Sequence, residues 1–267
     1  MVELFRRTMI GQRIGLGAVS LGLFGISVII VYTFKALGGA AVIADFFELL
    51  PEGMKAILHA QGGFATDAEG YLAADYRIPP YLVAISAFVI ASTSGAVARE
   101  IERGTVLMLL AAPVARWRFL AAKVAALVVG IATLAVSALA GTWVGLMLTG
   151  VEGVSMATFA LIQVTTFAFA FSIGGIGMLV SSLTSDGGQA MGITTAIVVV
   201  MFFVDFLSLL WEPAELLGPL AVFHYYDPLS VSVADALPLA DVLVLMTVGI
   251  VGTAAAFVVF QRRDITR

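Results

Sequence analysis

Six long apolar stretches constrain this chain more than any other feature of its sequence. An α-helix needs about 20 mostly apolar residues to cross the hydrocarbon core of a bilayer, whereas a membrane β-strand needs only about 10. The chain has 267 residues, of which 61% are hydrophobic and 12% charged, and a soluble fold cannot bury so much apolar surface. We therefore expect an all-α integral membrane protein with six transmembrane helices, which excludes an ordinary soluble enzyme and a nucleic-acid-binding protein. The six stretches are Ile14–Phe34, Pro79–Ala98, Val124–Thr149, Met156–Leu183, Gln189–Leu210 and Pro238–Phe260.

The first stretch follows three arginines and could be mistaken for a signal peptide. Its apolar run of 21 residues exceeds the roughly 7–15 residues of a signal-peptide core. We therefore expect it to remain as the first membrane-spanning helix.

The distribution of charge predicts the orientation, because cytoplasmic segments of membrane proteins are enriched in lysine and arginine. Six spans place both termini on one side, together with the segment 99–123 and the turn near Asp186. That side holds 11 basic and 5 acidic residues, and the remainder of the chain holds 3 basic and 13 acidic residues. Both termini are therefore predicted to be cytoplasmic. The 11 basic residues are Arg6, Arg7, Arg13, Arg99, Arg103, Arg116, Arg118, Lys123, Arg262, Arg263 and Arg267.

Two polar segments, 37–78 and 211–237, are expected on the outer side. In the first, Asp45 is suited to cap one short helix and Pro51 to begin another. We interpret these as interfacial helices lying on the membrane surface, and a lid over a transport path is the alternative. The second segment is expected to be broken into short interfacial or re-entrant pieces by its prolines. Its aromatic residues Trp211, Tyr225 and Tyr226 are typical of the headgroup level, and His224 among them is expected to be packed there rather than to bind a metal.

The predicted cytoplasmic loop 99–123 has the most distinctive sequence of the polar segments. A charged start leads into the apolar run Val106–Ala112, which Pro113 then ends. That run is too short to span a membrane, so we expect a short helix that lies on the membrane or docks into another protein. A simple elbow that redirects the chain remains an equal alternative. A further helix is expected to begin between Val114 and Lys123.

This loop resembles the loop that joins the second and third spans of ABC-2 type permeases. The shared pattern is a glutamate, a Gly-Thr pair followed by an apolar run, a proline, a basic residue and a lysine that begins the next span. Here these are Glu100, Gly104, Thr105, Val106–Leu110, Pro113, Arg116 and Lys123. The six-span topology agrees over the whole chain, 1–267, as a single transmembrane domain. The segment Phe223–Pro228 is similar to the one that precedes the last span in these permeases, and Ser181–Ser185 is similar to their turn between the fourth and fifth spans. That turn departs from the family in having Asp186 where a basic residue is common, which weakens any claim of an ionic contact with a partner there.

The resemblance implies a permease subunit of an ATP-driven exporter in a prokaryotic cytoplasmic membrane. No Gly-x-x-x-x-Gly-Lys-Ser/Thr motif is present, so the chain has no phosphate-binding loop of its own. It is expected to bind no cofactor, with ATP and Mg held by two copies of a separate ATPase subunit, and a second permease copy is expected to complete the transporter. The short helix in the loop is implied to couple the ATPase to the spans. The coupling residues implied are Arg99, Glu100, Glu102, Arg103, Gly104, Thr105, Leu107, Met108, Pro113 and Arg116.

In the resembled family the second and fifth spans line the substrate path near the dimer axis. For each serine or threonine the more common state is a hydrogen bond back to its own helix. Asp205 has more weight, because a charge within a span is costly and tends to face a cavity or a partner; we expect it to face the dimer axis. The weakly polar lining favours a hydrophobic or amphipathic substrate. The candidates are Ser86, Ser92, Thr93, Ser94, Thr194, Thr195 and Asp205.

Two other functions remain as alternatives. An ion-coupled secondary transporter usually shows buried ionisable residues and internal repeats, and Asp205 is the clear mid-span charge here. A non-transporting membrane anchor or assembly factor is the other. Gly174, Gly175 and Gly177 lie in an apolar span and are expected to allow close helix packing rather than to bind phosphate.

Overall fold

The computed structural model describes residues 2–39, 42, 49–51, 67–102 and 116–263. Every regular element within these residues is helical. Six helices are long and apolar enough to cross a membrane, which confirms the six predicted spans. They are α1 (Val2–Ala36), α5 (Pro79–Ser94) with its continuation α6 (Ala98–Glu102), α8 (Arg116–Thr149), α9 (Met156–Leu183), α10 (Gly187–Leu210) and α12 (Leu239–Arg262).

Several helix boundaries differ from those predicted. The first helix begins 12 residues before Ile14 and the third begins eight residues before Val124, because a helix continues into its polar flanks while its backbone hydrogen bonds are kept. The fourth span runs over the predicted residues. The fifth begins at Gly187, because the Asp186 carboxylate accepts a hydrogen bond from the Gln189 amide at 2.7 Å and caps the helix.

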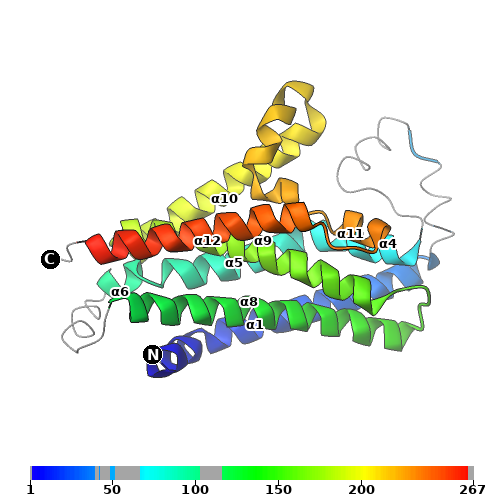
Figure 1. Cartoon of the computed structure of the whole chain (residues 1–267). Coiled ribbons are helices and arrows are strands. Elements are labelled where there is room, and N and C mark those ends of the chain that lie inside the picture. Colours follow the sequence, from blue (N-terminus) through cyan, green and yellow to red (C-terminus); the bar gives the residue numbers. More distant parts are fainter. Residues whose placement is uncertain (1, 40–41, 43–48, 52–66, 103–115, 264–267) are drawn as a thin grey trace.

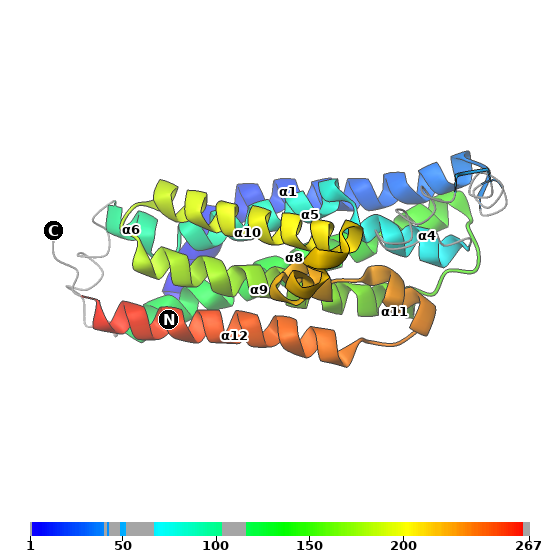
Figure 2. The same ribbon diagram turned by 90° about the horizontal axis from the view of Figure 1, so that it is seen from above.

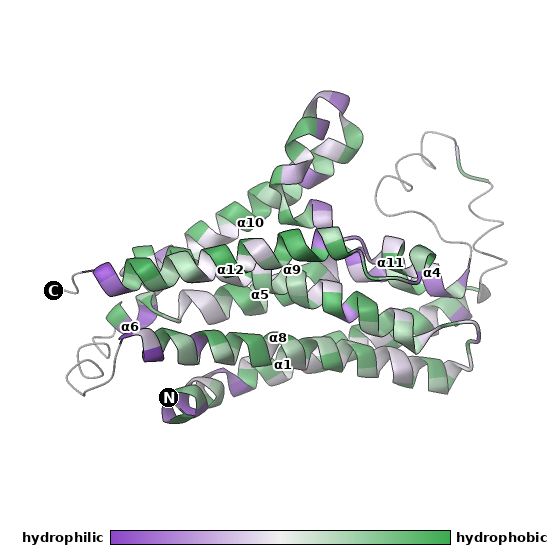
Figure 3. Ribbon diagram, in the orientation of Figure 1, coloured by the Kyte–Doolittle hydropathy of each residue, from purple (hydrophilic) through white to green (hydrophobic). Residues whose placement is uncertain are grey.

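The long helices form one elongated bundle, with α6 and both ends of the chain at the same end (Figure 1). This is the arrangement that six spans require; the cytoplasmic location of that end stays a prediction. Among the spans, α9 is the most buried, and it contacts α5, α8, α10 and α12. The pairs α1–α8 and α9–α12 form the most extensive contacts, and the view from above shows α12 running alongside α9 (Figure 2). The middle of the long helices is mostly hydrophobic, and hydrophilic residues gather towards the ends (Figure 3).

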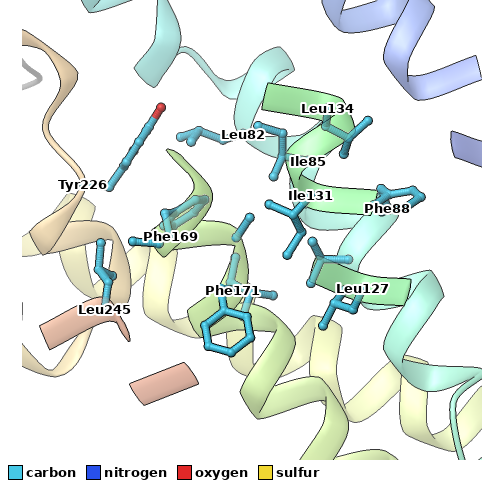
Figure 4. Packing of buried hydrophobic residues seen from close by; sticks show 14 of the residues in the cluster. Leu82, Ile85, Phe88, Leu127, Ile131, Leu134, Phe169, Phe171, Tyr226 and Leu245 are labelled. Atoms are coloured by element: carbon cyan, nitrogen blue, oxygen red, sulfur yellow. The ribbon is translucent and has the colours of Figure 1, made fainter. Parts of the chain in front are cut away.

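Large apolar side chains fill the space between α5 and α8. Figure 4 shows Leu82, Ile85 and Phe88 of α5 opposite Leu127 and Ile131 of α8, and all five side chains are buried. This contact fixes α5 against a helix that is distant in sequence.

Glycines allow α9 to approach its neighbours closely, as predicted from Gly174, Gly175 and Gly177. A Cβ atom on Gly175 would lie 2.4 Å from the carbonyl oxygen of Gly249 in α12, and one on Gly177 would lie 2.2 Å from Thr93 Oγ1 in α5. Any residue larger than glycine would clash with the neighbouring helix at these two positions. The close approach of the helices therefore confirms that these glycines serve packing.

The segments 67–78 and 211–237 are more deeply packed than the sequence suggested. Residues 68–77 form the short helix α4 (Ala68–Ala74) and the 3-10 turn η1 (Asp75–Arg77), with Leu72 and Tyr76 in the core. The proposed interfacial helices at 45–60 lie almost wholly outside the described residues.

The segment 211–237 is broken into short pieces as predicted, namely η2 (Glu212–Leu220), η3 (Val222–Tyr225) and α11 (Pro228–Ala234). Trp211 is exposed, which fits the headgroup level. Tyr226 differs in being only 1% exposed, and its ring stacks on Phe169 of α9 with the two ring centroids 4.8 Å apart.

Candidate functional site

The second span contains a break that the sequence did not predict. Helix α5 ends at Ser94, and α6 begins at Ala98 after three intervening residues. Ser181 of α9 bridges the break, since its hydroxyl accepts hydrogen bonds from the amides of Val97 (3.2 Å) and Ala98 (3.1 Å) and donates to the carbonyl of Ser94 (3.3 Å). One buried hydroxyl on α9 thus satisfies the backbone groups that the break leaves open.

Helix α6 is also joined to α10 and α8. The Glu102 carboxylate accepts a hydrogen bond from the Gly187 amide at the start of α10 (3.0 Å). Lys123 of α8 forms an ion pair with Glu100 at 2.9 Å. The two predicted coupling residues Glu100 and Glu102 therefore connect α6 to two different spans.

The start of α8 and Arg263, the residue after α12, also contact the region around α6 and the turn between α9 and α10. Arg116 at the start of α8 donates to the carbonyl of Arg263 at 2.8 Å. Arg263 in turn donates to the carbonyls of Ser182 and Thr184, each at 2.7 Å. The turn between α9 and α10 is thus held by α6 and by the end of α12.

The remaining coupling residues are placed as follows. Arg99 is half-buried on α6 and lines a cavity with α1 and α8. The other six lie outside the described residues: Arg103, Gly104, Thr105, Leu107, Met108 and Pro113.

A cavity of about 330 Å³ lies between α5 and α10, the second and fifth spans. Its lining is almost wholly apolar, and it includes the predicted path residues Ser86 and Thr195. The buried Ser86 hydroxyl has no hydrogen-bond partner among the described residues. This cavity is the part of the described structure that best fits an amphipathic ligand.

The other predicted path hydroxyls do not line this cavity. Thr93 donates to the Val89 carbonyl (2.9 Å), Ser94 to the Ala91 carbonyl (3.2 Å) and Thr194 to the Ala190 carbonyl (2.8 Å), which is the more common state expected for them. Ser92 lines the separate cavity beside Arg99.

Asp205 is buried and paired within its own chain. Arg77 of η1 donates to Asp205 Oδ2 at 3.0 Å, and the two side chains are 16% and 7% exposed. His224 Nδ1 lies 3.9 Å from Asp205 Oδ1, and Asp227 lies 3.9 Å from Arg77. A buried carboxylate needs a partner, and here Arg77 supplies it. The expected orientation towards a dimer axis stays a prediction.

The ion pair and the apolar cavity lie next to each other. A second cavity of about 280 Å³ is lined by Arg77 and Asp205. It shares Leu82, Phe202 and Phe223 with the cavity between α5 and α10. The two together form an apolar lining with a charged end at Arg77 and Asp205.

A buried tyrosine network, which the sequence did not predict, holds this charged end in place. Tyr76 is hydrogen-bonded to Thr142 Oγ1 of α8 at 2.5 Å. The hydroxyl of Tyr226 lies 2.9 Å from Thr166 Oγ1 and donates to the Tyr76 carbonyl at 3.3 Å. Burial raises the pKa of both tyrosines above the ordinary value, so both stay neutral. Tyrosines near a predicted span boundary carried no signal that would separate these two from headgroup-level residues.

Comparison with known proteins identifies one match. The family model described as ABC-2 family transporter protein covers residues 18–265. No curated protein matches the chain.

Proposed function

The chain belongs to the ABC-2 type transporter permease family, and from that premise we propose that it forms the path of an exporter for hydrophobic or amphipathic molecules. The family makes it the multi-pass membrane subunit of an ABC transporter, which works with an ABC ATPase in a lipid bilayer. The direction, the substrate class, the coupling residues and the pairing with a second copy belong to the proposal, as does its place in a prokaryotic cytoplasmic membrane.

The connections of α6 carry the proposed coupling. A motion imposed on the segment after Glu102 reaches α10 through the Glu102–Gly187 hydrogen bond, α9 through Ser181 and α8 through the Glu100–Lys123 pair. Packed helices move as rigid bodies rather than deform continuously. Under this proposal two ATPase subunits, which hold ATP and Mg, dock at segment 99–123, and their closure displaces these spans together.

The cavity between α5 and α10 supports the proposed substrate class. Its lining is apolar apart from the hydroxyls of Ser86 and Thr195, so it would accept an alkyl or aromatic group and would not compensate the loss of water around a sugar. Arg77 and Asp205 at the outer end would meet a polar group of the same molecule. The paired state of Asp205 weakens the alternative of an ion-coupled carrier, because that class needs a carboxylate that can gain and lose its ion.

The coupling is tested with the reconstituted complex of this chain and an ABC ATPase that co-purifies with it. We expect Glu102→Ala to reduce substrate-stimulated ATP hydrolysis about tenfold while the ATPase still co-purifies, and Gly104→Pro to abolish co-purification. Glu3→Ala is the control, because Glu3 is an exposed acid on α1. Transport by the chain alone down an ion gradient, or unchanged stimulation in Glu102→Ala, would contradict the proposal.

The path is tested by filling the cavity. Val199 lines it, and Val199→Trp is expected to abolish stimulation by long-chain amphiphiles. Ile250→Trp is the control, since Ile250 is 55% exposed on α12. Stimulation by soluble sugars but not by amphiphiles would exclude the proposed substrate class.

A further inference from the structure

A separate cavity of about 270 Å³ lies at the end of the bundle that holds α6. Its lining comes from α1, from the α5–α6 segment and from the start of α8. It shares none of its lining residues with the cavity between α5 and α10. The Glu100–Lys123 pair of the proposed coupling lies in its lining, but the cavity itself has no role in the proposed function.

Basic side chains from three helices meet in this cavity. Arg7 comes from α1, Arg99 from α6 and Lys123 from α8, and Glu100 is the acid in the lining. Glu100 is engaged by Lys123 at 2.9 Å. Within the described part of the chain, neither Arg7 nor Arg99 forms an ion pair with a carboxylate. The lining carries three positive charges and one negative charge.

The cavity lies at the boundary between apolar and polar parts of the chain. Arg99 directly follows the second apolar stretch, Lys123 directly precedes the third, and Arg7 lies one to two helical turns before the first. Leu4, Ala91 and Phe119 form apolar parts of the lining. A ligand held here would therefore have its charged group at the headgroup level and apolar surface beside it.

We propose that this cavity binds the phosphate of an anionic phospholipid. Guanidinium groups form paired hydrogen bonds with phosphate oxygens, and basic clefts between membrane helices are suited to anionic lipid headgroups. The hydroxyl of Ser92 lines the same cavity and is available as a further donor. The apolar part of the lining favours a lipid over a soluble phosphate, because acyl chains would cover the half-buried Leu4 and the exposed Ala91, whereas free phosphate would leave them in water.

The proposal is independent of the transport function and is tested by binding alone. The purified full-length chain in nanodiscs or neutral detergent is titrated with labelled phosphatidylglycerol and, separately, with phosphatidylcholine. We expect the native chain to prefer the anionic lipid about tenfold, and the double variant Arg7→Gln/Arg99→Gln to lose that preference. The control, Arg6→Gln/Arg118→Gln, removes the same charge from the same end, and neither of its residues lines the cavity.

Each outcome decides the proposal. A preference lost only in Arg7→Gln/Arg99→Gln, with an unchanged elution volume and melting temperature, supports a built lipid site. Equal loss in both double variants shows diffuse attraction to the basic end and overturns the site, as does an unchanged preference in Arg7→Gln/Arg99→Gln. Inorganic phosphate added alone separates the two sources of the ligand: if it displaces the lipid at the same concentration that the lipid needs to bind, the site takes a soluble phosphate and the lipid assignment is overturned.

Discussion

For Asp205, the sequence predicted that the buried carboxylate is functionally constrained but did not identify the residue that pairs with it. A carboxylate within an apolar stretch is expected to face a cavity or a partner, and the sequence favoured a position facing the dimer axis. The partner is Arg77, which is 128 positions away along the chain. Chain separation of that size leaves no local pattern, so only the folded chain could identify the pair.

The Arg77–Asp205 pair predicts that substitution of its two members lowers the unfolding free energy by different amounts. Removing one member of a buried ion pair costs about 3–5 kcal/mol, because the other charge is left unpaired. Arg77→Gln should therefore lower the unfolding free energy more than Asp205→Asn, since Asp227 remains 3.9 Å from Arg77 in the second variant.

The measurement is thermal unfolding in detergent of both single variants and of the double variant. The unfolding free energy of the double variant is expected to fall by less than the sum of the decreases in the two single variants. Additive losses would show that the two side chains do not interact in the folded protein.

Asp75 predicts a pH dependence of stability. Burial raises the pKa of Asp75 from about 3.8 to about 6. The charged carboxylate therefore destabilises the fold above pH 6, by at most about 3 kcal/mol, and this cost disappears as the pH falls from 6 to below 4. Asp75→Asn should raise the melting temperature at pH 7.5 and leave it nearly unchanged at pH 4, with the exposed Asp67→Asn as the control. An equal effect of Asp75→Asn at both pH values would show that charge is not the cause.

At the scale of elements, the break between α5 and α6 shows what apolar periodicity cannot reveal. The residues 79–98 are mostly apolar, and Gly95, directly after Ser94, is a residue that weakens a helix. The break is stable because Ser181 satisfies the free amides of Val97 and Ala98. A hydroxyl on another helix therefore decides where this helix ends.

The contact between α9 and α12 predicts that adding one methyl group at Gly175 lowers stability. A Cβ on Gly175 would lie 2.4 Å from the Gly249 carbonyl oxygen and 2.7 Å from the Gly249 Cα. Backbone atoms cannot rotate away, so Gly175→Ala forces the two helices apart and should cost about 1–3 kcal/mol. Gly22→Ala on α1 has no atom within 4 Å of its new methyl group and should be neutral or stabilising by up to about 1 kcal/mol. The melting temperatures of the two variants provide the test, and a Gly175→Ala protein as stable as the native one would contradict the packing.

At the scale of the whole molecule, the least covered span is α10. Its described contacts bury Gly187, Ala190, Thr194, Val198 and Asp205, and leave most other positions exposed in the single chain. Its end with η2 stands away from the other helices (Figure 1). A surface of this kind meets either lipid or a second copy.

The proposed pairing of two copies predicts a crosslink on α10. The chain has no cysteine, so a single introduced cysteine reports one position. Val200→Cys, at a position 60% exposed, is expected to give an oxidised dimer in membranes. Ile29→Cys on α1, at a position 63% exposed, should remain monomeric. Crosslinking at both positions, or only on α1, would contradict a dimer formed along α10.

The sequence by itself determined the number of spans, their approximate positions and the concentration of basic residues at one end. These follow from local quantities, because twenty consecutive apolar residues and a run of arginines act through the bilayer rather than through distant contacts. The family resemblance of the loop 99–123 was also readable, and the family match to residues 18–265 confirms it. Only the tertiary structure decided the partners of Asp205, the burial of Tyr226, the break bridged by Ser181 and the meeting of Arg7, Arg99 and Lys123. Each of these joins residues far apart in the chain, and such contacts depend on how the helices pack, which no single apolar stretch encodes.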